Sequence, residues 1–228
     1  MTAPLLIIGA GGLSRETLAA VEAVNSVRPQ WTVLGFLDDN PALHGQIIDG
    51  RPVLGPTGLV AEQPDAAVVL TIASPRNLGT RKKIVHRLDL PAHRWATVVH
   101  PTASIAPGTE LGAGSVFLAA TVVTAPQVIG AHVVAMPHTT ITHDDNISDY
   151  VQFASGVRLS GGVTVGESAY LGSGSMVREG LTIGAGALLG MGAVVLSDVP
   201  PGEVWVGNPA RRLRTTNSVD QIPTRTPA

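Results

Sequence analysis

The chain has 228 residues, a net charge of −2, an isoelectric point near 6.4 and no cysteine. The charge balance gives no sign of a nucleic-acid or anionic-membrane partner, and the lack of cysteine excludes disulfides, thiolate metal sites and a cysteine nucleophile. No apolar run reaches the roughly 18 residues of a membrane span, and the N-terminus lacks a signal-peptide pattern, so we expect a cytoplasmic protein with no membrane partner.

The first predicted unit is a strand, a glycine-rich turn and a helix. The apolar run Leu5–Ile8 precedes Gly9–Gly12, and residues 13–25 carry apolar residues at helical spacing. Glycines let the backbone approach a phosphate, and a helix start offers free N–H groups, so this unit is typical of nucleotide-binding α/β domains. The fingerprint is incomplete because Ser14 takes the place of the third glycine, which leaves a purely geometric role for the glycines as an alternative.

Alternating strands and helices continue to about residue 90. A second strand over 32–37 ends in Asp38 and Asp39, where such folds grip a ribose or base, although Asp is also an ordinary turn former. A third strand is predicted over 67–73 and a basic amphipathic helix over 76–88. This alternation predicts a small parallel sheet. About ninety residues are too few for a two-halved dinucleotide fold, so a mononucleotide or nucleotide-sugar is favoured over NAD.

Beyond this unit, every sixth residue is apolar. The seventeen positions are Val99, Ile105, Leu111, Phe117, Val123, Ile129, Ala135, Ile141, Ile147, Phe153, Leu159, Val165, Leu171, Val177, Ile183, Leu189 and Val195. Small residues often stand two places before them, and glycines often follow them. A period of six fits neither a helix nor a simple strand but predicts a parallel β-helix, in which each coil of about eighteen residues has three short strands.

One polar run interrupts this pattern, over residues 137–146. Within it, His143 lies two places after an inward position and should face outward near a corner. A neutral imidazole there can accept a proton from an amine or hydroxyl group, and a carboxylate of Asp144 or Asp145 can fix its tautomer. Gln127, one coil below Asp145, is a second polar exception in the small-residue column. An exposed polar loop without chemistry is the alternative.

Two histidines of this run also permit a metal hypothesis. His138 and His143 have the H-x4-H spacing of the gamma-class carbonic anhydrases, which share the β-helical prism. Those enzymes need a third histidine from a neighbouring subunit. The corresponding place in this chain is near Thr102, where His100 is out of phase. A trimeric metalloenzyme therefore stands as the alternative to acyl transfer.

Several motifs together resemble one family, the sugar acetyltransferases of the sialic-acid O-acetyltransferase type. This hexapeptide-repeat family includes the bacterial N-acetyltransferase that acts on a UDP-linked 4-amino sugar in the bacillosamine pathway. The similarity covers about residues 5–214. Its motifs are Ile8-Gly9-Ala10-Gly11-Gly12 with Arg15-Glu16, Gly35-Phe36-Leu37-Asp38-Asp39, His143-Asp144 with Ile147-Ser148-Asp149-Tyr150, Leu159-Ser160-Gly161-Gly162-Val163, and Gly207-Asn208-Pro209-Ala210.

The resemblance implies an α/β plus all-β architecture in three segments. These are a Rossmann-like nucleotide- or nucleotide-sugar-binding domain over 1–95, a left-handed β-helix acyltransferase domain over 96–214 and a segment over 215–228, whose own polar composition with two prolines predicts a mobile tail. It further implies a homotrimer that holds acetyl-CoA between neighbouring β-helices and needs no metal. The acceptor would be a sugar acylated on nitrogen or oxygen, and a nucleotide-linked sugar is favoured.

The resemblance also assigns roles to individual residues. His143 would be the general base, Asp144 its orienting partner and the Gly161 N–H the donor to the thioester oxyanion. The remaining assignments fall into a coenzyme set and a nucleotide set. Ser173, Gly174, Met191 and Gly192 would line the pantetheine groove, Arg211 or Arg212 would meet CoA phosphates, and Gly11, Gly12, Asp38 and Asp39 would hold the nucleotide.

Two departures from the family pattern affect the acceptor. Leu13 and Gln152 stand where the family often has histidines, at positions bordering the donor or acceptor site. The identity of the acceptor is therefore open, although both residues remain predicted substrate contacts. Because no cysteine can carry an acyl group, direct transfer in a ternary complex is favoured. A non-catalytic binding or scaffold protein of the same fold is the remaining alternative.

Overall fold

The computed structural model describes residues 2–73 and 75–216. Its N-terminal part is a five-stranded sheet in the order β3-β4-β2-β1-β5. The elements are β1 (Ala3–Ile8), α1 (Gly12–Val27), β2 (Trp31–Leu37), β3 (Ile47–Ile48), β4 (Arg51–Gly55), β5 (Ala67–Leu70) and α2 (Thr80–Leu88), with short 3-10 helices at Pro41–Leu43, Thr57–Glu62 and Ala92–Arg94. The predicted parallel pairing of β1 with β2 and with β5 is present, so the first unit is a small α/β domain.

Two predicted boundaries in this domain differ from the structure. The third strand ends at Leu70 instead of residue 73, and the helix expected from residue 76 begins at Thr80. The intervening residues include Pro75, Asn77 and Gly79, which favour turns over a regular helix. The edge strand β3 forms a short antiparallel hairpin with its neighbour β4, which the sequence pattern did not reveal. Residues 71–73, which directly follow β5, consequently lie at the carboxyl edge of the sheet, where ligands bind in such folds.

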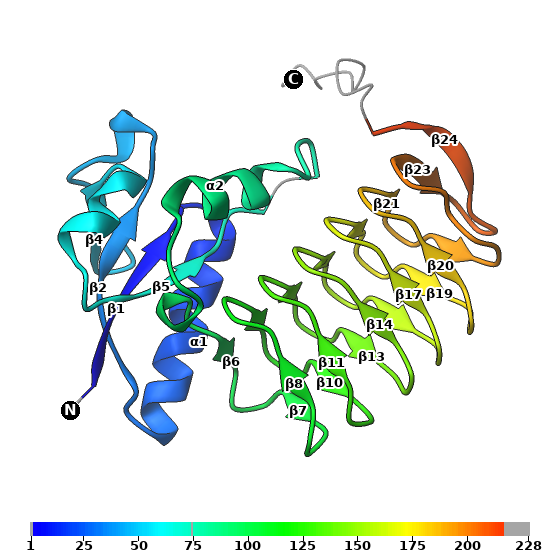
Figure 1. Ribbon diagram of the computed structural model, residues 1–228, viewed down its shortest axis with the longest axis horizontal. Helices are drawn as coiled ribbons and strands as arrows, with labels where there is room; N and C mark the ends of the chain where they lie inside the picture. Colours follow the sequence, from blue (N-terminus) through cyan, green and yellow to red (C-terminus); the bar gives the residue numbers. More distant parts are fainter. Residues whose placement is uncertain (1, 74, 217–228) are drawn as a thin grey trace.

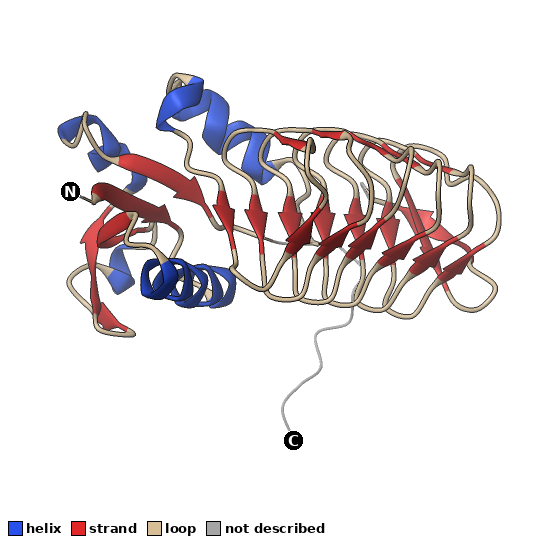
Figure 2. Cartoon of the chain, turned by 90° about the horizontal axis from the view of Figure 1, so that it is seen from below, coloured by secondary structure: helices blue, strands red, loops and turns tan. Residues whose placement is uncertain are grey.

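The rest of the described chain is a left-handed parallel β-helix with three faces (Figures 1 and 2). The first face contains β6 (Val98–Val99), β9 (Val116–Phe117), β12 (Val134–Ala135), β15 (Gln152–Phe153), β18 (Tyr170–Leu171), β21 (Leu188–Leu189), β23 (Glu203–Val206) and β24 (Arg211–Thr215). The second contains β7 (Ser104–Ile105), β10 (Val122–Val123), β13 (Thr140–Ile141), β16 (Arg158–Leu159), β19 (Met176–Val177) and β22 (Val194–Val195). The third contains β8 (Glu110–Leu111), β11 (Val128–Ile129), β14 (Asn146–Ile147), β17 (Thr164–Val165) and β20 (Thr182–Ile183).

The six-residue column forms the interior of this prism, as predicted. Each column residue is the second residue of its strand, and those from Phe117 to Val195 belong to one buried cluster. Val99, Ile105 and Leu111 are only partly buried because they belong to the first coil and have no coil beneath them. Parallel strands in successive coils pair at a spacing of about 4.8 Å, so residues eighteen apart lie one above the other.

Three corners join the faces in every coil, and each stack of corners forms an edge of the prism. We call the stack between the first and second faces the first edge; it includes residues 136–139, 154–157, 172–175 and 190–193. The second edge, between the second and third faces, includes 142–145 and 160–163. The third edge joins the third face back to the first. Ligand-binding residues can thus be assigned to an edge by sequence position alone.

The α/β domain packs on the outer side of the first face. Outward residues of the lower coils, including Val116 and Val134, form one buried cluster with Leu13 and Leu18 of α1. Helix α2 lies along the third edge, where Lys82 forms an ion pair of 2.6 Å with Glu167. A continuous apolar contact therefore fixes the two domains against each other (Figure 1).

A buried polar cluster reinforces this contact. Arg81 of α2 is fully buried and donates to the carbonyls of Leu70, Ile72 and His132. The His132 ring stacks on Tyr150 at a centroid distance of 5.2 Å. Burial, with Arg81 nearby, lowers the pKa of His132 from its usual 6.5 to about 4. This histidine is therefore neutral at physiological pH and serves the domain contact.

The C-terminal hairpin closes the last coil. Strand β23 continues the first face beyond β21, and β24 returns antiparallel to it. The predicted tail over 215–228 overlaps β24 by one residue, and its part from 217 onward lies outside the described residues. Neither α1 nor α2, the two α-helices in the described ranges, is long and apolar enough to cross a membrane.

Candidate active site

His143 projects from a corner of the second edge. Its side chain is 68% exposed, and Nδ1 lies 2.8 Å from Oδ2 of Asp144. Asp144 occupies the left-handed corner conformation with φ of 62°, which Asp tolerates better than most residues. Because the carboxylate engages Nδ1, Nε2 is the nitrogen left to accept a proton. The pair has the orientation expected of a general base and its partner.

Asp145, the second carboxylate considered for this role, turns inward. It is only 4% exposed, and its two oxygens accept the backbone N–H groups of Thr142 and Val163, each at 2.8 Å. Burial raises the pKa of Asp145, although these two hydrogen bonds oppose the shift. Asp144 is consequently the residue paired with His143, and Asp145 organises the backbone around it.

Gln127 supports the same corner from the coil below. Its Nε2 donates to the carbonyl of Thr142 at 2.9 Å. Thr142 is thus held at its N–H by Asp145 and at its carbonyl by Gln127, directly before His143. Both polar residues stand in the small-residue column, so their exceptional positions were visible in the sequence, but the bracing role was not inferred from them.

Gly161 lies one coil above His143 on the second edge. A Cβ at residue 161 would come within 2.3 Å of Cε1 and 2.5 Å of Nε2 of the imidazole. Any side chain there would displace the ring. Among the hydrogen bonds of the described chain, the Gly161 N–H donates none, while its carbonyl accepts from Gly180. An unused donor therefore stands next to the proposed base, as an oxyanion site requires.

The glycine turn of the α/β domain forms a cavity of about 250 Å³. Three of the four residues predicted to hold the nucleotide, Gly11, Gly12 and Asp38, line it together with Leu13. Asp38 Oδ2 accepts the N–H of Ala10 at 3.0 Å and so fixes the turn to the tip of β2. Gly11 at the start of α1 provides no side-chain cap, so the first N–H groups of the helix stay free for an anion.

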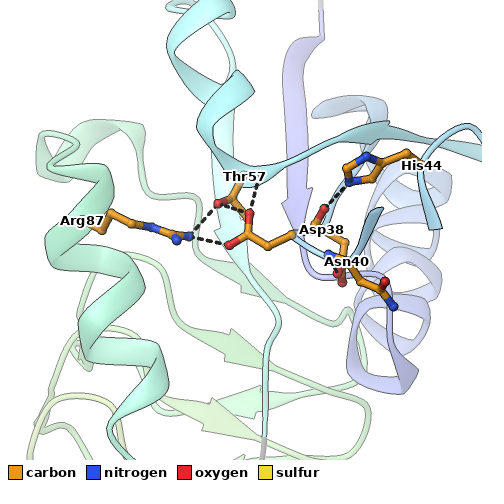
Figure 3. Close-up of polar contacts among 6 residues, drawn as sticks. Asp38, Asn40, His44, Thr57 and Arg87 are labelled. Carbon is orange, nitrogen blue, oxygen red and sulfur yellow. Dashed lines mark hydrogen bonds and ion pairs between the residues drawn. The ribbon is translucent and has the colours of Figure 1, made fainter. Parts of the chain in front are cut away.

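Asp39, the neighbouring carboxylate, is directed to a different place. Its Oδ1 accepts from the backbone N–H and hydroxyl of Thr57 at 2.9 and 2.7 Å, and its Oδ2 pairs with Arg87 of α2 at 2.8 Å. Figure 3 shows Arg87 and Thr57 on one side and Asp38, Asn40 and His44 on the other. The structure thus does not bring Asp39 to the glycine cavity, because successive side chains at a strand end point in opposite directions.

A second cavity, of about 350 Å³, lies at the junction of the two domains, and we call it the junction cavity. Its lining combines the α/β domain with the first face and first edge: Gly12, Leu13, Glu16, Ala73, Val134, Met136, Gln152, Phe153, Ala154, Ser155, Tyr170 and Ser173. It shares Gly12 and Leu13 with the glycine cavity. The two positions that depart from the family pattern, Leu13 and Gln152, therefore lie in one cavity although 139 residues separate them.

The residues predicted to hold the coenzyme lie along the first edge. Ser173 and Gly174 are stacked beneath Met191 and Gly192, and the Gly192 N–H donates to the Ser173 carbonyl at 2.9 Å. Met191 is 81% exposed, and a Cβ at either glycine would meet no atom within 4 Å. Arg211 begins β24 next to Val206, at the upper end of this edge. The set forms an open, continuous strip.

One chain does not bring these groups together with His143. The base and Gly161 lie on the second edge, whereas Ser173 and the junction cavity lie on the first, and a whole face of the prism separates them.

The structure places the two histidines of the metal alternative on different edges of the prism. His138 belongs to the first edge and His143 to the second, and His100 Nδ1 is hydrogen bonded to Thr102. Within residues 2–73 and 75–216, no three His, Cys, Asp or Glu side chains gather as a possible ligand set.

Comparison with known proteins agrees with the two-domain architecture. Residues 4–88 match the family model described as the PglD N-terminal domain. The chain is 32% identical over 166 residues to the GDP-perosamine N-acetyltransferase of Escherichia coli O157:H7. The aligned residues cover 72% of this chain and 73% of that protein.

Solved structures of similar proteins contain the expected ligands. The acetyltransferase domain of PglB from Neisseria gonorrhoeae FA1090 in complex with acetyl coenzyme A is 28% identical, with a TM-score of 0.81 over 93% of this chain and 100% of that one. PerB from Caulobacter crescentus in complex with CoA and GDP-perosamine is 26% identical, with a TM-score of 0.80 over 92% and 97%. The chain belongs to the sugar acetyltransferases of the hexapeptide-repeat family.

Proposed function

We propose that this protein transfers the acetyl group of acetyl-CoA to the amino group of a GDP-linked amino sugar. Support for the donor comes from the acetyl-CoA and CoA complexes of its structural relatives. Support for the acceptor comes from the GDP-perosamine named for its relatives. A nitrogen acceptor is favoured over oxygen because these relatives are N-acetyltransferases of the same two-domain design.

The side chains and backbone groups around His143 support a direct transfer of the acetyl group. The neutral amine attacks the thioester carbonyl, a C–N bond forms, and His143 Nε2 takes the proton that the nitrogen must lose. Asp144 stabilises the resulting imidazolium through Nδ1, and the Gly161 N–H stabilises the oxyanion of the tetrahedral intermediate. When the C–S bond breaks, the proton passes from His143 to the departing CoA thiolate. No covalent acyl-enzyme is required.

The acceptor would occupy the two connected cavities. Its diphosphate fits the glycine cavity, where the uncapped start of α1 provides free N–H groups. Its sugar would then extend past Gly12 and Leu13 into the junction cavity. Ser173 on the far wall of that cavity also belongs to the strip predicted for pantetheine, so acceptor and donor would meet there.

We further propose that the protein acts as a homotrimer. In a closed ring of three, the second edge of each copy meets the first edge of the next, so every subunit contributes His143 to its neighbour's cavity. The separation of the two edges within one chain supports this arrangement. It also explains why a catalytic histidine is 68% exposed in the single chain.

The His143–Asp144 pair against Gly161 is the observation that carries the proposed function. The test is CoA release from acetyl-CoA with GDP-perosamine, using the wild-type protein, His143→Ala and, as a matched control, the exposed α2 variant His86→Ala. We expect a loss of about 10² to 10⁴ in turnover for His143→Ala and none for His86→Ala. Wild-type rates in His143→Ala would overturn the role of His143, and no release with any GDP-, UDP- or dTDP-linked amino sugar would favour a scaffold instead.

A further inference from the structure

Gln152 is a buried amide without partners. It is the first residue of β15, so its side chain points outward from the prism onto the first face, between Val134 below and Tyr170 above. The contact with the α/β domain leaves it only 2% exposed. Neither Oε1 nor Nε2 makes a hydrogen bond to any described residue. Burial of an unpaired amide costs free energy, so this glutamine is unfavourable for the free protein alone.

The surroundings of Gln152 indicate where its partners come from. The amide lines the junction cavity together with Leu13 and the apolar residues Val134, Met136 and Ala154. Glu16 and the hydroxyl-bearing residues Ser155, Tyr170 and Ser173 also line this cavity. An amide offers both a carbonyl acceptor and N–H donors. A ligand group with both properties, such as a sugar hydroxyl, is the natural complement.

We propose that Gln152 is a specificity-determining residue, which recognises a hydroxyl group of the acceptor sugar adjacent to the carbon that bears the amine. Oε1 accepts a hydrogen bond from this hydroxyl group. Nε2 donates a hydrogen bond to the oxygen of this hydroxyl or of the hydroxyl on the next carbon. This inference rests on the proposed function, because the sugar must reach the junction cavity through the glycine cavity.

The chemistry of an amide has a consequence for pH. Gln152 carries no titratable proton in the range where a histidine changes charge. Recognition of the sugar by this amide therefore adds no protonation step of its own. A site that pairs its buried polar groups with a substrate hydroxyl rejects analogues that lack that hydroxyl far more strongly than an apolar pocket rejects a missing methylene.

The test compares Gln152→Met, which keeps the length and volume of the side chain, with the surface control Gln30→Met. Without ligand, we expect the Tm of Gln152→Met to equal or exceed that of the wild type, since an unpaired buried amide is removed. With GDP-perosamine, kcat/KM should fall by about 10- to 10²-fold through KM, and KM for acetyl-CoA should be unchanged. Gln30→Met should match the wild type in all measurements.

A substrate analogue tells recognition from a structural role. GDP-perosamine that lacks the hydroxyl next to the amine should react equally well with the wild type and Gln152→Met. A lower Tm with unchanged acceptor KM would overturn the inference by showing a structural amide, and a raised KM for acetyl-CoA instead would assign Gln152 to the donor. If the wild type turns over GDP-perosamine and Gln152→Met does so equally, only this inference fails. If the wild type releases no CoA with any nucleotide-linked amino sugar, the proposed function fails and this inference with it.

Discussion

The imidazole of His143 lies directly against Gly161 of the next coil, at a distance that leaves no room for a Cβ. Stacking of coils at a fixed spacing creates this contact, because residues eighteen apart share a corner. The ring is therefore positioned by the fold as well as by its bond to Asp144, and the free N–H of Gly161 stands beside it. The same repeat therefore positions both the proposed base and the proposed oxyanion donor.

Replacement of Gly161 by alanine should inactivate the enzyme without unfolding it. The added methyl group would lie 2.3 Å from Cε1 and must displace the ring, and a shift of about 1 Å in a catalytic group can cost about 10²-fold in rate. Steady-state assays with acetyl-CoA and a GDP-linked amino sugar measure the effect. Gly58→Ala is the control, because a Cβ there meets no atom within 4 Å. Equal rates for Gly161→Ala and wild type would show that the ring position does not matter.

Replacement of Asp144 and of Asp145 by asparagine should have different effects on turnover and on stability. Asp144→Asn keeps a residue that tolerates positive φ but loses the negative partner of the imidazolium, so kcat should fall while the Tm stays within a few degrees of the wild type. Asp145→Asn places an NH2 group against one of two backbone N–H donors, and we expect it to lose about 1–3 kcal/mol of stability. Urea unfolding and turnover of both variants decide this. A stable Asp145→Asn would contradict the bracing role of that carboxylate.

Substitutions of the neighbouring residues Asp38 and Asp39 should have different effects on GDP affinity and on stability. Asp38→Ala removes the acceptor that holds the glycine turn through Ala10, so the affinity for GDP should decrease. Asp39→Ala removes contacts to Thr57 and Arg87 and should reduce stability with little effect on GDP binding. Calorimetric titration with GDP and thermal unfolding measure the two effects. Loss of GDP affinity in Asp39→Ala alone would reverse the assignment.

The domain contact should weaken in acid because of His132. Its pKa is about 4 in the folded protein and near 6.5 when unfolded, so between these values the unfolded state binds more protons. Stability must then rise with pH across this window and be lost as pH falls from about 6.5 towards 4. His132→Asn, which tolerates the left-handed corner, should flatten this part of the slope in urea unfolding between pH 7 and 4.5. The exposed-histidine variant His86→Ala should keep the slope, and an unchanged slope in His132→Asn would exclude its origin in this ring.

The sequence pattern predicted the prism but not the sites between its parts. One inward apolar residue in six is a period that neither helices nor ordinary strands produce, so the column from Val99 to Val195 specified the β-helix. The inward turn of Asp145 was not predicted, because Asp145 was considered beside Asp144 as a partner of His143, although its place in the small-residue column was visible in the sequence. The junction cavity was not, since it joins Leu13 to Gln152 by packing of two domains, and no local pattern reports such a contact. The opposite directions of Asp38 and Asp39 likewise depend on where α2 places Arg87.

Subunit complementation tests most directly the claim that two copies build one active site. His143→Ala removes the base from the second edge, and Gly12→Trp fills the cavities on the acceptor side, where a Cβ meets no atom within 4 Å. Each variant alone should be inactive with acetyl-CoA and GDP-perosamine. In randomly mixed trimers, about a quarter of the interfaces combine an intact His143 with an intact cavity of the neighbour, so activity should return to about a quarter of wild type. Mixed trimers that form but stay inactive would contradict a site shared between two chains.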